Sequence, residues 1–308
     1  MSTVRAISPL VRTGRAVRDA YRGVQYARAR TPPPLGTRPP IELAVCTLFR
    51  DEARYLAEWV TFHRLQGVER FFLYDNLSTD DWRAALQPEL RAGVVQVVHW
   101  PRTPGQKSAF EDCLRRHRTD VRWLAFIDVD EFLFSPTGRS VRELLRGFDQ
   151  CPGVVVNWRV YGTNGWEQAP DGLVIENYLM RGLDRHSTNR YVKEIAYPRL
   201  TLGPVNGPHH FNHRGGAPPV GEDKAVAELW GSREPPTADI LRINHYYAKS
   251  SEQHRLKVAR ASVWTGRKGI ESGSLPDVEV RDDVILRFAP ALRRSLSERL
   301  DGSFREGT

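Results

Sequence analysis

The chain has 308 residues, 40% hydrophobic and 10% aromatic, a composition that fits a globular protein and excludes wholesale disorder. No apolar run approaches the roughly 18–20 residues of a membrane-spanning helix, and the N-terminus lacks the apolar stretch of a secretory signal. The net charge is +8, but residues 1–40 hold eight arginines and one acid, which leaves about +1 for the other 268 residues. A nucleic-acid partner is therefore not expected for the body of the chain.

Residues 1–40 are predicted to form a separate basic tail that ends in a proline-rich linker. Apolar residues recur there at three- to four-residue steps between the arginines, the pattern of an amphipathic helix that can lie on an anionic membrane. A solvated, partly disordered arm fits the composition equally well, and a transit peptide fits it less well. The three cysteines lack metal-type spacing, as expected of buried thiols in a reducing compartment. We expect a cytoplasmic protein whose residues 1–30 can contact the inner face of the membrane.

From residue 41 strands and helices alternate. Strands are expected at 42–49, 70–74, 94–99 and 123–127, and helices at 52–66, 82–90 and 108–117. Continuous apolar strands separated by helices predict an α/β fold with a mostly parallel sheet covered by helices on both faces. Later elements are expected as strands at 154–160, 172–175 and 240–243, helices at 251–263 and 284–300, and a loop over 203–239. The main domain is expected over 41–270, followed by a C-terminal helical extension over 271–308.

The chemistry is predicted to centre on Asp128 and Asp130, which follow the apolar strand 123–127 directly. In an extended segment the period of two would aim both carboxylates to the same side. Two oxygen donors there can hold Mg²⁺ or Mn²⁺ and leave positions for a diphosphate. An Asp-x-Asp pattern alone is weak, but solvated aspartates have little reason to end the strand that looks most buried.

Other polar residues sit at the ends of predicted strands. Asp75 follows the strand 70–74 and can either accept hydrogen bonds from a uracil or a ribose, or simply order the turn. His245 follows a late strand and can complete a metal shell, or be a structural histidine. The histidines of residues 209–213 lack the spacing of a structural zinc site and are interpreted as loop residues that can line an acceptor cleft. Phosphate-binding glycine loops and a nucleophile elbow are missing from the sequence.

Taken together, these blocks resemble the GT-A glycosyltransferases, most closely glycosyltransferase family 92 and its bacterial family-2-like relatives. The resemblance runs in order from about residue 42 to about 265 and is carried by Phe49-Arg50-Asp51-Glu52, Tyr74-Asp75-Asn76, Trp123–Phe132, Gly162-Thr163-Asn164-Gly165 and Asn244-His245-Tyr246. It implies a Rossmann-like GT-A fold and a nucleotide-diphosphate sugar donor, often a UDP-sugar. The tail and the last forty residues fall outside it.

The resemblance also implies roles for individual residues. Asp75 would face the base, and Asp128 and Asp130 would bind the metal and the diphosphate, with His245 as the third protein ligand. Arg50 and Lys193 would contact the diphosphate, although the stretch after Lys193 lacks the serine and arginine of relatives.

The expected reaction is transfer of the sugar to an acceptor hydroxyl of a glycan, a lipid-linked sugar or a protein, with inversion at the anomeric carbon. The catalytic base is expected to be Glu176 or Glu167, with Glu222 and Asp223 as alternatives. Trp158, Trp166 and Tyr178 can stack on sugar faces or belong to the core. Two other functions stay open: a nucleotidyltransferase acting on a sugar phosphate, and a non-enzymatic membrane- or nucleic-acid-binding protein that acts through its tail.

Overall fold

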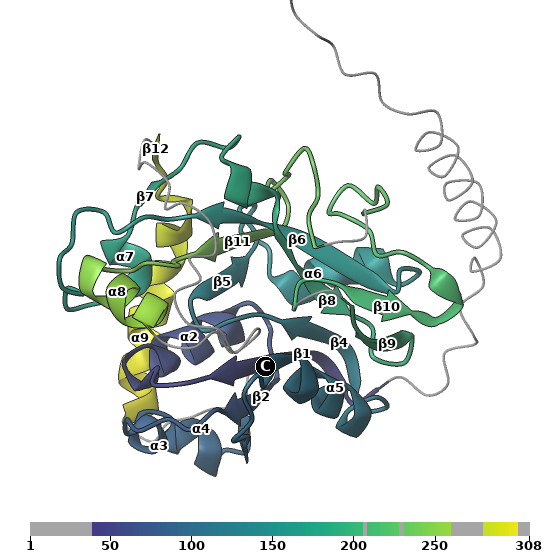
Figure 1. Cartoon of the computed structure of the whole chain (residues 1–308), viewed down its shortest axis with the longest axis horizontal. Helices are drawn as coiled ribbons and strands as arrows, with labels where there is room; N and C mark the ends of the chain where they lie inside the picture. Colours follow the sequence, from purple (N-terminus) through teal and green to yellow (C-terminus); the bar gives the residue numbers. More distant parts are fainter. Residues whose placement is uncertain (1–38, 206–207, 228–230, 260–279, 301–308) are drawn as a thin grey trace, which may run out of the picture.

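The structure is a computed structural model that describes residues 39–205, 208–227, 231–259 and 280–300. Its centre is one large sheet with helices on both sides (Figure 1). Some predictions fall outside the described residues, namely those for residues 1–38, 206–207, 228–230, 260–279 and 301–308. No helix in the described ranges is both long enough and apolar enough to cross a membrane.

The eight strands of the sheet run in the order β3-β2-β1-β4-β8-β6-β11-β5. They are β1 Ile41–Phe49, β2 Arg70–Asp75, β3 Val95–His99, β4 Val121–Phe126, β5 Glu131–Phe134, β6 Gly153–Val160, β8 Val192–Ala196 and β11 Arg242–His245. The first four neighbours are parallel, β8 is antiparallel to both β4 and β6, and β11 is parallel to β6. Strands β1 to β4, β6 and β11 therefore all point the same way, and the sheet is mostly parallel as predicted.

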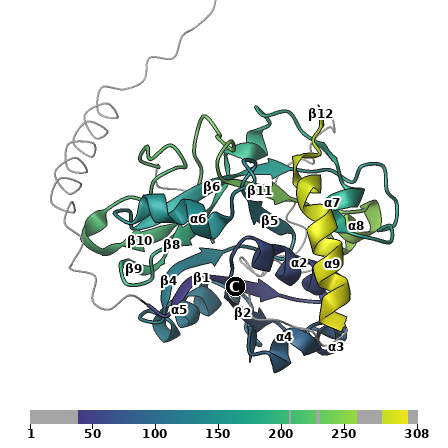
Figure 2. The ribbon, with the colours of Figure 1, turned by 180° about the vertical axis from the view of Figure 1, so that it is seen from behind.

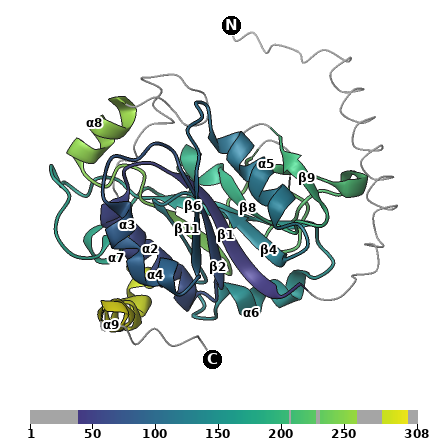
Figure 3. The same ribbon diagram turned by 90° about the horizontal axis from the view of Figure 1, so that it is seen from below.

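Helices cover the sheet on both faces. The helices are α2 Ala53–Leu65, α3 Trp82–Ala85, α4 Gln87–Arg91, α5 Gln106–Arg116, α6 Val141–Leu145, α7 Val174–Asn177, α8 Ser251–Ala259 and α9 Ala289–Leu300. Figure 3 shows α5 on the opposite side of the sheet from α2, and α9 packs beside α2 (Figures 2 and 3). Alternate residues of β1 point to opposite faces of the sheet. Leu43 and Val45 pack toward α2, whereas Ala44 and Cys46 pack toward α5. Two short ribbons, β9 Thr201–Pro204 with β10 Phe211–His213 and β7 Met180–Arg181 with β12 Val280–Arg281, lie outside the main sheet.

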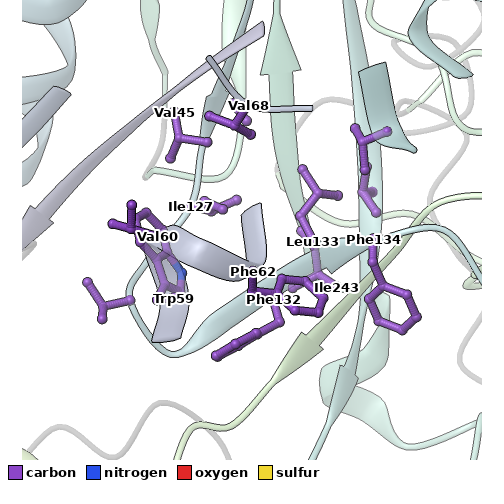
Figure 4. Packing of buried hydrophobic residues seen from close by; sticks show 14 of the residues in the cluster. Val45, Trp59, Val60, Phe62, Val68, Ile127, Phe132, Leu133, Phe134 and Ile243 are labelled. Atoms are coloured by element: carbon purple, nitrogen blue, oxygen red, sulfur yellow. The ribbon is translucent and has the colours of Figure 1, made fainter. Parts of the chain in front are cut away.

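The larger apolar core lies between the sheet and α2. Figure 4 shows Phe62 of α2 against Phe132 and Phe134 of β5, with ring centroids 5.1 and 6.2 Å apart. Phe288, just before α9, packs against both Phe62 and Phe134, with ring centroids 5.6 and 5.8 Å apart. Burying such aromatic side chains stabilises the fold strongly. Because Phe132 follows Glu131 directly, this packing also fixes the loop that precedes β5.

Several predicted elements differ from the structure. The helix expected at 82–90 is divided at Leu86, and α4 begins beside Pro88, whose ring is tolerated only in a first turn. The strand expected at 172–175 is wrong: the segment enters α7, and the buried Glu58 carboxylate accepts hydrogen bonds from the backbone N–H groups of Val174 and Ile175. The strand expected at 240–243 lies at Arg242–His245. The predicted loop 203–239 contains β10 and the end of β9, and the C-terminal helix begins with a 3₁₀ turn over Val284–Phe288.

Candidate functional site

The chemistry-bearing residues predicted from the sequence gather at one edge of the sheet. Arg50, Asp75 and Asp128 follow or end β1, β2 and β4, and His245 ends β11. All four strands are parallel, so their carboxyl ends meet at this edge, where open α/β sheets bind ligands. Strand β8 runs the other way and therefore brings Lys193, near its start, to the same edge.

Asp128 is held by a buried lysine. Its Oδ2 accepts a hydrogen bond from the Nζ of Lys193 at 2.6 Å, and its Oδ1 accepts one from the Nε2 of Gln106 at 2.8 Å. Lys193 is almost fully buried, whereas 32% of the Asp128 side chain remains exposed. Burial acts to lower the pKa of Lys193, but Asp128 and Glu131 raise it above its ordinary value, so the ammonium stays charged.

Asp130 faces different partners, a histidine and a lysine. The structure places it in a turn after β4 rather than in an extended strand, so the period of two that the sequence suggested does not apply here, and the two carboxylates have different partners. Its Oδ2 lies 3.5 Å from the Nε2 of His245 and also accepts a hydrogen bond from the Nζ of Lys257 in α8. Burial acts to raise the pKa of Asp130, but Lys257 and His245 hold it well below its ordinary value.

Glu131 supports the loop that carries Asp128 and Asp130, here called the acidic loop. It is fully buried, and its Oε2 accepts the backbone N–H of Asp128 at 2.8 Å and lies 3.4 Å from the Nζ of Lys193. Burial raises the pKa of Glu131 to about 8, although the positive charge of Lys193 acts to lower it. On the other side, the indole N–H of Trp59 donates to the carbonyl of Glu131 at 2.8 Å, and the Nε2 of His63 accepts the N–H of Leu133 at 3.0 Å. These bonds fix the backbone that carries both aspartates.

The donor set suits a hard divalent cation in its chemistry: two carboxylates and an imidazole at a partly exposed edge. Across the described ranges, however, no three or more His, Cys, Asp or Glu side chains already lie close enough together to hold a metal ion. The Asp128 carboxylate pairs with Lys193 and the Asp130 carboxylate with Lys257. The residue types fit such an ion in their chemistry.

The strand ends beside the acidic loop have a simpler geometry. Asp75 is buried; its Oδ1 accepts the N–H of Ser78 at 2.9 Å, and its Oδ2 lies 3.5 Å from the Nδ1 of His99. One oxygen thus orders the turn, and the other faces His99. Arg50 lies at the end of β1 with its Nε 3.7 Å from Asp51.

The two predicted bases are both paired with arginines. Glu176 in α7 binds Arg293 of α9 through both carboxylate oxygens. Glu167 is exposed and accepts a hydrogen bond from Arg255 of α8 at 2.6 Å, which lowers its pKa. Of the alternatives, Glu222 accepts backbone N–H groups in residues 239–241, and Asp223 pairs with Arg233, which are both roles in loop structure.

Aromatic residues line the loop on the β6 side. The ring of Trp158 lies 4.3 Å from that of His245 and 5.2 Å from that of His209. By contrast, His210 and His213 are buried beside Glu194, and the Nε2 of His213 lies 2.7 Å from its Oε1. Trp166 is partly exposed and donates to the carbonyl of Asn177. Tyr178 is buried in the main core.

Three residues of this site were missed in the sequence. Lys257 lies in an unremarkable helical stretch, Gln106 begins α5, and Glu131 lies inside the block Trp123–Phe132 and was given no binding or catalytic role. The bond that Glu131 accepts from the Asp128 N–H shows that it supports the loop.

Comparison with known proteins gives the chain a family. Residues 40–212 match the family model of Glycosyltransferase family 92. The chain belongs to glycosyltransferase family 92. The match contains the acidic loop, Asp75 and Lys193, while His245 and Lys257 lie beyond it.

Curated relatives of this family occur in plants. A family 92 protein of Ricinus communis is 33% identical over 222 residues, covering 70% of this chain and 37% of the relative. One of Oryza sativa subsp. japonica is 32% identical over 182 residues, covering 56% of this chain and 30% of the relative. A galactan beta-1,4-galactosyltransferase of Arabidopsis thaliana is 29% identical over 107 residues, which is 31% of this chain and 21% of the relative. The chain thus spans about a third or less of the length of these relatives.

Among solved structures, S. aureus TarS 1-349 aligns with a TM-score of 0.36 and 13% identity, over 52% of this chain and 48% of that chain.

Proposed function

We propose that this family 92 chain is a glycosyltransferase that moves a sugar from a nucleotide-diphosphate sugar to an acceptor hydroxyl. The observation that carries the proposal is the acidic loop after β4, where Asp128 and Asp130 meet Lys193, Lys257 and His245 at the carboxyl edge of the parallel strands. This edge offers both signs of charge, as a site for a cation and a diphosphate requires. Family membership supports sugar transfer as the reaction.

A UDP-sugar is the donor we propose. Asp75 lies at the end of β2, and its Oδ1 orders the turn. Its other oxygen, Oδ2, can accept a hydrogen bond from the uracil N–H or the ribose. Lys193 and Arg50 supply positive charge for the diphosphate. Since one relative is named a galactan beta-1,4-galactosyltransferase, UDP-galactose is the first donor to test.

A divalent ion, Mn²⁺ or Mg²⁺, would be held by Asp128, Asp130 and His245. When bound, such an ion supplies charge that neutralises the leaving diphosphate. The chain's own part is to position the donor: buried Glu131, Trp59 and His63 fix the backbone of the loop, and Lys193 adds a charge that stays in place because it is buried.

The acceptor hydroxyl would attack the anomeric carbon from the side opposite the diphosphate, so the configuration would invert. A carboxylate must take the hydroxyl proton within about 3 Å. Glu176 and Glu167 remain our candidates, and each must first leave its arginine. Trp158, which belongs to the buried core and has its ring beside that of His245, is our candidate to pack against the sugar. The acceptor would be a glycan, a lipid-linked sugar or a protein.

The experiment is to incubate the full chain with a panel of nucleotide sugars, with and without Mn²⁺, and identify the released product. Release of a nucleoside diphosphate, lost in Asp130→Asn and in metal-free buffer, supports the proposal. Pyrophosphate release from a sugar phosphate and a nucleoside triphosphate would instead support a nucleotidyltransferase. Full activity without metal would overturn the metal-dependent part.

We also propose that the protein works in the cytoplasm and that residues 1–30 give it a peripheral contact with anionic lipid. The proposal rests on the arginine-rich, acid-poor sequence of this segment. Deleting residues 1–38 should abolish sedimentation with vesicles that contain phosphatidylserine and leave donor turnover within about twofold. Equal sedimentation of both forms would contradict a membrane role for the tail.

A further inference from the structure

The two lysines of the acidic loop differ in how firmly they are held. Lys193 is 1% exposed and comes from β8 in the middle of the sheet, so its ammonium cannot leave Asp128 without disrupting the core. Lys257 is 40% exposed, while the Asp130 side chain that it contacts is only 10% exposed. The Asp130 pair is therefore a fixed, buried carboxylate with a cation that reaches it from the solvent side.

Helix α8, which carries Lys257, is weakly attached to the body. None of its side chains is buried. The N–H groups of Ser251 and Glu252 donate to the carbonyls of residues 166 and 167, and Arg255 pairs with Glu167. Tyr247 is the aromatic neighbour of the helix: its ring lies 5.7 Å from that of His254, and Lys257 packs over it at 3.9 Å. A helix with few buried apolar contacts can move at low cost in free energy.

The buried Asp130 carboxylate needs partners that compensate its charge. Removing a carboxylate from water is costly unless an opposite charge or hydrogen bonds compensate it. A divalent ion on the same oxygen would repel the Lys257 ammonium at hydrogen-bonding distance. Because Asp130 is fixed between β4 and β5, the ammonium is the partner that moves.

We propose that Lys257 is an exchangeable counter-ion of Asp130, which yields this carboxylate to the divalent ion and then contacts the donor diphosphate. The inference rests on the proposed function and adds Lys257 as a donor-binding residue. The Lys257 ammonium is bonded to the Asp130 oxygen that a cation on this carboxylate would compete for. Before the donor arrives, the Lys257 ammonium neutralises the buried Asp130 carboxylate. Afterwards, the Lys257 ammonium faces the phosphate oxygens of the donor.

The test compares Lys257→Met with a control on the same helix, Arg255→Met, which removes an equal charge that pairs with Glu167 instead of Asp130. Binding of Mn²⁺ alone to the full chain is measured by electron paramagnetic resonance, and binding of UDP at saturating Mn²⁺ by calorimetry. Lys257→Met should bind Mn²⁺ about tenfold or more tightly, since a charge-assisted hydrogen bond no longer competes. The same variant should bind UDP about tenfold more weakly, and Arg255→Met should change either affinity less than about threefold.

Opposite signs of the two effects are the signature of the exchange. Unchanged or weaker Mn²⁺ binding in Lys257→Met would overturn the counter-ion role, and unchanged UDP binding would overturn the donor contact. Weaker binding of both ligands would indicate structural damage and count against the proposal, with circular dichroism as the check of folding. If the wild-type chain binds neither Mn²⁺ nor UDP, the proposed function itself fails. If it binds both and Lys257→Met behaves like the wild type, only this inference fails.

Discussion

Replacing Lys193 by methionine tests the electrostatics of the acidic loop in isolation from catalysis. Methionine keeps an unbranched side chain of similar length but removes the charge that faces Asp128 at 2.6 Å and Glu131 at 3.4 Å. Breaking a buried ion pair by removing one partner costs about 3–5 kcal/mol. Because 32% of the Asp128 side chain is exposed, water can replace part of the lost interaction. We therefore expect the lower end of that range, about 3 kcal/mol of unfolding free energy.

The assay is urea unfolding followed by circular dichroism, in a double-mutant cycle with Asp128→Asn. Adding Asp128→Asn to Lys193→Met should recover about 1–2 kcal/mol, because the unpaired carboxylate disappears. The matched control is Lys107→Met, which breaks an exposed pair with Glu111 at 3.9 Å and should cost less than about 0.5 kcal/mol. A cost below about 1 kcal/mol for Lys193→Met, with strictly additive effects in the cycle, would refute the buried pair.

Three further outcomes are expected. Burial raises the pKa of Glu58 to about 7 and lowers that of His63 to about 3. Between pH 4.5 and about 7, Glu58 is protonated in the folded state and ionised in the unfolded state. Between about pH 3 and 6.5, His63 is neutral in the folded state and protonated in the unfolded state. Between about pH 4.5 and 6.5 the two effects on stability have opposite slopes and cancel, so the thermal unfolding temperature should be level there. It should fall below about pH 4.5, where only His63 acts, and fall slightly between about pH 6.5 and 7, where only Glu58 acts, and a continued rise to pH 8 would contradict the assignment. Phe62→Ala should cost about 3–5 kcal/mol in urea unfolding, and a loss under about 1 kcal/mol would mean that the core of Figure 4 is packed differently. Of Glu176→Gln and Glu167→Gln, the one that replaces the base should lower sugar transfer at least about 100-fold while UDP binding stays unchanged, and full transfer in both would exclude both residues.

The sequence predicted the part of the fold that follows apolar periodicity. Strands β1 to β4 and β6, and the helices between the first four, lie within a few residues of their expected positions, because continuous apolar runs mark buried parallel strands. The same pattern placed Asp128 and His245 at strand ends, which meet at one edge once the strands are parallel.

Strands β5 and β8 were missed for an identifiable reason. They carry Glu131, Lys193 and Glu194, charged residues that single-sequence patterns assign to the surface but that the structure buries in pairs. The pairing of Lys193 with Asp128 depends on the antiparallel register of β8, which no local pattern specifies. Lys257 was invisible for a similar reason, since one lysine on a polar helix gives no signal until the helix is placed beside Asp130.

The most direct test of the central claim is a crystal structure of the full chain with UDP and Mn²⁺, in which anomalous scattering locates the metal. We expect the ion within about 2.2 Å of carboxylate oxygens of Asp128 and Asp130, with His245 as the third protein ligand, the diphosphate beside Lys193 and the uracil beside Asp75. Manganese and nucleotide bound away from the carboxyl edge of the sheet, with the Asp130–Lys257 pair intact, would contradict the account.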